Sequence, residues 1–166
     1  MNSELKKFDE ITVTVFYLGK IKYAPGTFGS IAALTILFLP GYMIWYSSLI
    51  FVLVLSIIGF NSIKRYENVK GFDHSSIVID EVIGMLIALS NPYLILTPFW
   101  ILISLGIFRI FDILKPFPIN LLNIRKGAFF VIVDDVAAGI FTLVIVHIFQ
   151  LGYRILPFFI SFWEKY

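Results

Sequence analysis

The chain carries no formally charged residue between Gly26 and Ile63, which is enough length for two membrane-embedded helices. Pro40-Gly41 interrupts this stretch and predicts a short helix over 27–39, joined by a tight turn to a long helix over 42–60. The short helix would span about 20 Å, less than a ~30 Å hydrocarbon core, whereas the long helix can cross it. With 59% hydrophobic and only 14% charged residues, the chain does not have the composition of a soluble domain.

The rest of the chain repeats this alternation of short and long apolar segments. Residues 77–89 form a short apolar segment, and residues 93–114 and 129–149 are each long enough to cross a bilayer. Proline, glycine and charged residues predict polar loops over 61–76 and 115–126. The pattern therefore predicts helical hairpins whose polar loops lie on one side of the membrane.

The two ends of the chain are predicted to lie at the membrane surface. Residues 11–19 form a short apolar segment with charged flanks, and residues 150–166 mix aromatic and basic side chains. The first ten residues lack the basic-then-apolar order of a cleaved signal peptide. We therefore expect one membrane-embedded domain over 1–166, with an all-α fold. It would be a polytopic integral membrane helical bundle of short, partly re-entrant helices and full-length transmembrane helices.

The basic residues indicate which side of the membrane the loops face. The loops around 20–22, 64–70 and 115–126 hold eight of them: Lys20, Lys22, Lys64, Arg65, Lys70, Lys115, Arg125 and Lys126. The two intervening turns, Pro40-Gly41 and Asn91-Pro92, contain none. By the positive-inside rule, the basic loops are expected to be cytoplasmic.

Two pairs of adjacent acids stand near the ends of apolar segments: Asp80-Glu81 and Asp134-Asp135. A carboxylate at a membrane boundary is unfavourable unless a cation or hydrogen bonds compensate it. The chain has no cysteine, and Mg²⁺ prefers oxygen ligands. The two pairs therefore predict a Mg²⁺ site, the alternative being that each pair is a solvated helix N-terminus.

A third group, Arg109, Asp112 and Lys115, is spaced by three residues and so shares one helix face. Arginine offers a planar fork to phosphate oxygens, and lysine offers a point charge. Asp112 can orient the arginine or join the metal. The alternative is an ion-paired helix end that faces lipid headgroups.

The segment 24–30, Ala-Pro-Gly-Thr-Phe-Gly-Ser, opens a helix. Backbone N–H groups and the hydroxyls of Thr27 and Ser30 predict a phosphate cradle there, unless the segment is an ordinary turn with a hydroxyl cap. Lys20, just before it, is a further candidate to reach a phosphate. His74 is expected to be a loop residue.

With these residues the chain resembles the phosphatidylglycerophosphatase A family. The resemblance rests on four blocks in the family's order: 24–30, 76–84, 108–119 and 134–139. It implies Mg²⁺-dependent removal of the terminal phosphate from the phospholipid phosphatidylglycerophosphate, at the inner membrane of bacteria. The family often has Gly-x-Gly-x-x-Pro before the first block, and here Tyr17 and Lys22 replace its first glycine and its proline.

The hypothesis assigns roles to the acids. Asp80, Glu81, Asp134 and Asp135 would hold one or two Mg²⁺ ions, and the catalytic acids would be Asp80, Asp112, Asp134 and Asp135. A metal-activated water is preferred as nucleophile over Asp112, because the chain has no Asp-x-Asp signature.

Two other functions remain open from the sequence. One is a lipid-headgroup phosphotransferase, although the spaced acidic signature of CDP-alcohol phosphotransferases is absent. The other is a divalent-cation transporter or channel, which would need acids along a path through the membrane. No nucleic-acid partner is expected, and the oligomeric state is left open.

Overall fold

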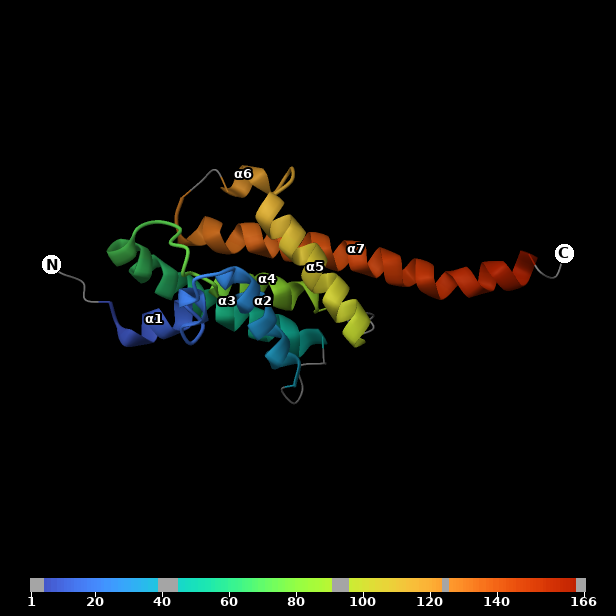
Figure 1. Cartoon of the computed structure of the whole chain (residues 1–166), viewed down its shortest axis with the longest axis horizontal. Coiled ribbons are helices and arrows are strands. Elements are labelled where there is room, and N and C mark those ends of the chain that lie inside the picture. The colour runs from blue at the N-terminus through green and yellow to red at the C-terminus, as the bar shows by residue number, and fades with distance from the viewer. Residues whose placement is uncertain (1–4, 39–44, 91–95, 124–125, 164–166) are drawn as a thin grey trace.

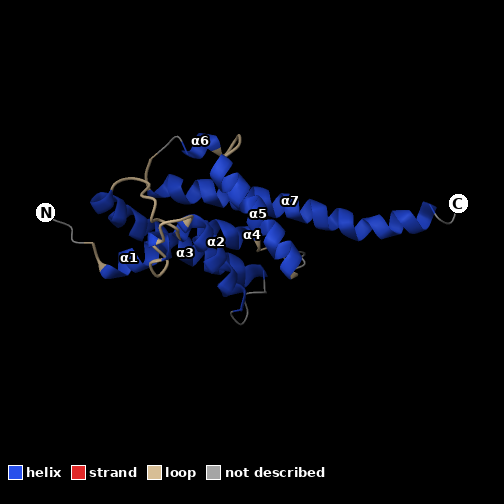
Figure 2. Cartoon of the chain, in the orientation of Figure 1, coloured by secondary structure: helices blue, strands red, loops and turns tan. Residues whose placement is uncertain are grey.

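A computed structural model describes residues 5–38, 45–90, 96–123 and 126–163 (Figure 1). Within these ranges every regular element is a helix (Figure 2). In chain order they are α1 (Lys7–Val13), η1 (Leu18–Lys20), α2 (Pro25–Thr35), η2 (Ile36–Phe38), α3 (Trp45–Lys70), α4 (Ile79–Ala88), α5 (Pro98–Leu114), α6 (Asn120–Asn123) and α7 (Ala128–Trp163), where η marks 3₁₀ turns. The predicted all-α class is confirmed for the described residues.

α3 is longer than the sequence predicted. The helix continues through residues 61–70, so the loop predicted over 61–76 is wrong for that part. The charged residues of this stretch suggested a loop, but Ile63 and Tyr66 are buried while Lys64 and Lys70 are exposed. Such one-sided burial is typical of an amphipathic helix end.

α7 and α5 also differ from their predicted bounds. α7 does not end near 149 but runs through most of the predicted surface tail to Trp163, with Pro157 inside it. α5 begins at Pro98, where the Thr97 hydroxyl accepts a hydrogen bond from the Trp100 N–H at 3.5 Å. The predicted turns at 40–41 and 91–92 lie outside the described residues.

α4 lies at the centre of the bundle, in contact with α2, α3, α5 and α7. Eight of its ten residues are buried. At 1.5 Å per residue it is about 15 Å long, too short to cross a bilayer. Its first turn, which carries Asp80 and Glu81, is therefore enclosed by protein.

Two glycines bring α4 and α7 into direct backbone contact. A Cβ atom on Gly139 would lie 2.3 Å from the carbonyl oxygen of Gly84, and one on Gly84 would lie 2.6 Å from that of Asp135. Glycine is required wherever two helix backbones approach this closely. The contact fixes the Asp135 turn of α7 against α4.

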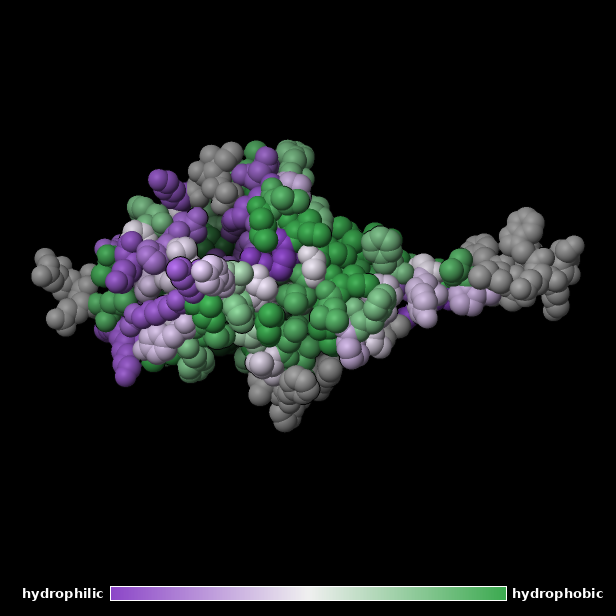
Figure 3. Space-filling view, viewed as in Figure 1, coloured by the Kyte–Doolittle hydropathy of each residue, from purple (hydrophilic) through white to green (hydrophobic). Residues whose placement is uncertain are grey.

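Among the described residues, two helical segments are long and apolar enough to cross a membrane, Leu49–Lys70 and Ala128–Pro157. Large apolar side chains are also exposed on several helices, among them Leu53 (60%), Leu102 (64%) and Ile148 (61%). Figure 3 shows hydrophobic residues over much of the face drawn, and polar residues gathered around α1 and the adjoining end of the molecule. Soluble proteins rarely expose this much contiguous apolar surface. The fold has the character of a membrane protein.

The N-terminal segment packs on the bundle through polar contacts. Asp9 of α1 is buried and accepts hydrogen bonds from the Arg65 guanidinium at 2.6 and 2.8 Å, which hold the pKa of the Asp9 carboxyl below its usual value. The Val78 N–H donates to the Val13 carbonyl at 3.0 Å, just before α4 begins. Residues 11–19 are therefore not one surface helix, since α1 ends at Val13 and a tight turn follows.

Candidate metal and phosphate site

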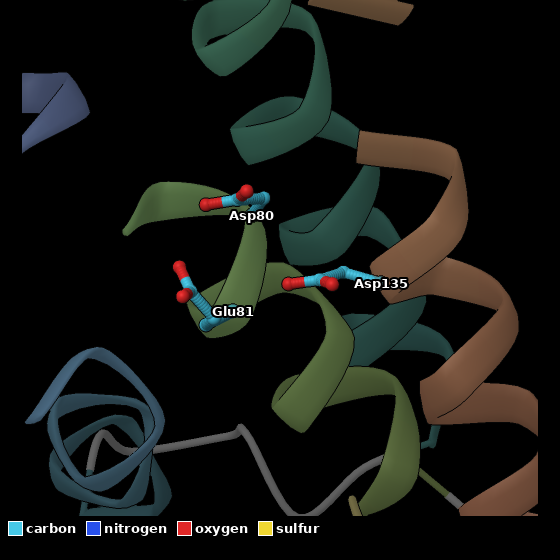
Figure 4. Close-up of side chains that lie close together, drawn as sticks. All are labelled: Asp80, Glu81 and Asp135. Atoms are coloured by element: carbon cyan, nitrogen blue, oxygen red, sulfur yellow. The ribbon is translucent and has the colours of Figure 1, made fainter. Parts of the chain in front are cut away.

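Three carboxylates from two helices converge at the start of α4. Asp80 and Glu81 come from the first turn of α4 and Asp135 from α7, and Figure 4 shows their side chains directed into a shared space. One carboxylate oxygen from each lies within 4.8 Å of those of the other two. Residues 55 positions apart in the chain (80 and 135) are thus brought together by the glycine contact between α4 and α7.

The chemistry of this cluster fits a hard divalent cation. Asp80 Oδ1, Glu81 Oε2 and Asp135 Oδ2 are all buried without a hydrogen-bond partner. Burial raises the pKa of both Asp80 and Glu81, because a carboxylate loses its hydration in the interior. Buried unpaired oxygens are rare in folded proteins, and a cation that prefers oxygen ligands is the group that would satisfy them.

Arg109 stands beside the cluster in the arrangement that the sequence predicted. Its Nη1 donates to Asp112 Oδ2 at 2.5 Å and lies 3.8 Å from Glu81 Oε1. Its Nε is buried without a partner. Asp112 therefore orients the guanidinium, which retains N–H groups that can meet an anionic ligand.

Asp134 is not part of the three-carboxylate cluster and forms an ion pair with Lys115. Lys115 ends α5 in a left-handed conformation with φ 42°, which turns the chain away from the helix. The second oxygen of Asp134 accepts the Asp135 N–H at 3.1 Å. Asp134 thus lies in the site but faces a lysine, and its predicted role as a metal ligand stays a prediction.

The N-terminus of α2 closes one side of the site through Gly26. A Cβ atom there would lie 2.1 Å from Glu81 Oε1 and 2.9 Å from Arg109 Nη1, so any larger residue would displace these two side chains from the site. The alternative of a turn with a hydroxyl cap is wrong, because Ala24 is the N-cap residue and makes no side-chain hydrogen bond. The Ser30 hydroxyl is buried and donates to the Gly26 carbonyl at 3.0 Å.

These groups line a cavity of about 550 Å³. It contains all of Asp80, Glu81, Arg109, Asp112, Lys115, Asp134 and Asp135. Thr27, Ser30 and Lys20 are not part of its lining. The cavity thus gathers the acidic pairs and the cation stripe, but not the predicted hydroxyls.

His74, expected to be a loop residue, forms part of the cavity wall. Its Nδ1 accepts the Ser76 N–H at 3.2 Å and lies 2.8 Å from the Ser76 hydroxyl, which is 2.7 Å from the Tyr66 hydroxyl. The chain of contacts fixes the imidazole ring at the cavity edge. Only its closeness in sequence to Asp80 could have indicated this position.

Comparison with known proteins gives consistent matches. The sequence model of the family described as Phosphatidylglycerophosphatase A matches residues 11–150. A phosphatidylglycerophosphatase A of Haemophilus influenzae is 35% identical over 161 residues, covering 90% of this chain and 96% of that protein. The corresponding Escherichia coli K12 protein is 33% identical over 131 residues, covering 75% of this chain and 73% of that protein.

A further relative carries a different description. A Bacteroides thetaiotaomicron protein, described provisionally as a phosphatidylinositol-3-phosphatase, is 30% identical over 139 residues, covering 80% of this chain and 87% of that protein. No solved structure matches the chain. From the span of the family match and the identity to these relatives, the chain belongs to the phosphatidylglycerophosphatase A family.

Proposed function

We propose that the protein is a Mg²⁺-dependent lipid phosphatase that hydrolyses phosphatidylglycerophosphate to phosphatidylglycerol and inorganic phosphate. Membership of the family supports the reaction and the lipid. The observation that carries the proposal is the cluster of Asp80, Glu81 and Asp135 beside Arg109. One carboxylate oxygen from each lies within 4.8 Å of the others, and each residue has a buried oxygen without a partner among the described residues. A divalent cation would satisfy the carboxylates, and a phosphate beside it would satisfy the Arg109 guanidinium.

Asp80, Glu81 and Asp135 would hold the metal, with Asp134 as a further candidate. When bound, Mg²⁺ supplies positive charge that polarises phosphoryl oxygens and activates water as a nucleophile. Arg109 would bind the phosphoryl oxygens through its free N–H groups and neutralise the charge that develops on them. Asp112 would keep the guanidinium in place, and Lys115 would add positive charge at the cavity wall.

The cavity is proposed to open toward the cytoplasmic face of a bacterial inner membrane. Basic residues accompany it, including Lys115 and Lys126 in its lining, and basic segments favour the cytoplasmic side. The long apolar helices α3 and α7 would cross the bilayer, and the short, buried α4 would lie within the bundle. A lipid whose acyl chains remain in the membrane could then present its phosphate to the cavity.

The transporter alternative gains no support from the described residues. The three carboxylates gather in one cavity at the start of α4, and membership of a phosphatase family points to hydrolysis. A phosphotransferase would need a second substrate to take part in the headgroup transfer. None of the relatives named above is described as a phosphotransferase.

Purified protein is expected to release inorganic phosphate from phosphatidylglycerophosphate when Mg²⁺ is present. A chelator should remove at least nine-tenths of that activity, and added Mg²⁺ should restore it, because the clustered carboxylates need a cation to act together. Phosphate release in detergent micelles is the measurement, with a phosphatidylinositol phosphate as the comparison substrate. Full activity in excess chelator would contradict the metal proposal, and preference for the inositol lipid would contradict the substrate.

Replacing Arg109 by lysine is expected to lower kcat/KM by about a hundredfold while leaving the protein folded. Lysine keeps the charge but loses the planar fork that both Asp112 and a phosphate require, a loss typical of removing one charge-stabilising donor. Steady-state rates and thermal melting would measure both effects. Arg154→Lys, at an exposed position on α7 outside the cavity, is the matched control, and equal effects in the two variants would argue against the role of Arg109.

A further inference from the structure

A second cavity, of about 450 Å³, adjoins the candidate active site. Pro25, His74 and Ser75 line both cavities. The two spaces therefore share one wall, and the hydrogen bonds of His74 to Ser76 hold part of that wall in place.

The second cavity has the opposite charge to the first. Lys20, Lys22 and Lys70 line it, with Glu10 as its acidic residue. Lys20 is paired with Glu10 at 2.6 Å, so Lys22 and Lys70 give the cavity its net positive charge. A cavity of this charge favours an anion and disfavours the cation proposed for the neighbouring carboxylate cluster.

The loop that supplies two of these lysines is held against the wall of the site. A Cβ atom on Gly19 would lie 2.1 Å from the Ser76 carbonyl oxygen. The Gly19 N–H donates to the Thr14 carbonyl at 2.9 Å, and Lys20 lies over the Tyr17 ring at 4.7 Å. The segment that carries Lys20 and Lys22 is thus held against the wall that the two cavities share.

We propose that the second cavity binds the phosphodiester of the lipid whose terminal phosphomonoester occupies the first cavity; this inference rests on the proposed function. In phosphatidylglycerophosphate one glycerol joins the two phosphates, and the cavities share one wall. The glycerol would lie along Pro25, His74 and Ser75. Lys22 and Lys70 then give the enzyme a preference for lipids with two phosphates over lipids with one.

The test uses the double variant Lys22→Gln/Lys70→Gln of the full chain in micelles of a neutral detergent. The two reaction products serve as probes, because phosphatidylglycerol carries only the diester and inorganic phosphate carries no lipid. We expect KM for phosphatidylglycerophosphate to rise about tenfold and inhibition by phosphatidylglycerol to weaken by a similar factor. The kcat and the inhibition by inorganic phosphate should stay within about twofold of wild type.

Each other outcome has a defined meaning. An unchanged KM and unchanged inhibition by phosphatidylglycerol would overturn the diester site, and weaker inhibition by inorganic phosphate alone would make the cavity a site for free phosphate. The control Lys7→Gln/Lys64→Gln removes the same charge outside both cavities, and an equal rise in its KM would show general attraction to anionic micelles instead. If the wild-type protein released no phosphate from the lipid, the proposed function itself would be wrong.

Discussion

Asp80→Asn is expected to reduce phosphate release from phosphatidylglycerophosphate by about a thousandfold or more, equivalent to roughly 4 kcal/mol of transition-state stabilisation. Asparagine keeps the size of the side chain but removes the negative charge from a cluster whose oxygens lie within 4.8 Å of one another. Asp135→Asn is expected to act in the same way from α7. Steady-state phosphate release at saturating Mg²⁺ is the measurement.

We expect Asp80→Asn to lose catalytic activity but not to unfold. Asp80 Oδ1 and Asp135 Oδ2 are buried without partners, so removing one charge relieves repulsion in the metal-free protein. Metal-free Asp80→Asn should therefore melt no lower than metal-free wild type, whereas Mg²⁺ should raise its melting temperature less.

Asp73→Asn is the matched control for this variant. Asp73 borders the same cavity, and its positive φ of 49° suits asparagine. Its activity should stay within a few-fold of wild type. If Asp80→Asn and Asp73→Asn were equally active, the carboxylate cluster would not be the catalytic centre.

Gly139→Ala is expected to lower both stability and activity. The added methyl would lie 2.3 Å from the Gly84 carbonyl oxygen and 3.2 Å from Ile87 Cβ, so α4 and α7 must separate. Overpacking of this kind typically destabilises by about 1–3 kcal/mol. Because the same contact places Asp135 beside Asp80, a shift of about 1 Å can cost around a hundredfold in rate.

Gly152→Ala provides the comparison on the same helix. A Cβ atom at Gly152 has no neighbour within 4 Å, so alanine there should be neutral or should stabilise α7 by up to about 1 kcal/mol. Thermal melting and phosphate release would be measured for both variants. Similar behaviour of the two would mean that the close contact between α4 and α7 does not position the site.

The broad pattern of helices was predictable because proline, glycine and long apolar runs mark where helices can lie. The error over 61–70 arose because a run of charged residues looks like a loop, although Ile63 and Tyr66 continue the buried face of α3. Burial of that face depends on tertiary contacts, which local sequence does not contain. The extension of α7 past 149 has a different cause: residues 151–157 are exposed, and neither their polar side chains nor Pro157 ends the helix.

The candidate site was predictable as a set of residues but not in its detailed pairing. Neighbouring residues on a helix point about 100° apart, and the sequence does not say which of Asp134 and Asp135 faces α4. The structure gives that position to Asp135 and pairs Asp134 with Lys115. The Thr27 and Ser30 hydroxyls do not cap the helix, because α2 begins at Pro25 with Ala24 as its N-cap residue.

The enclosure of α4 has a consequence for how the protein is made. Ribosomes deliver α4 before α5 and well before α7, so the acids of α4 exist for a time without Arg109 and without the glycine surface that packs on Gly84. A nascent chain stopped before α5, at residue 98, would lack both Arg109 and α7 and would expose an apolar helix with two uncompensated acids to lipid or solvent. Chains that terminate early should therefore be recognised and degraded by cellular quality control. Completion of α7 completes both the fold and the carboxylate cluster.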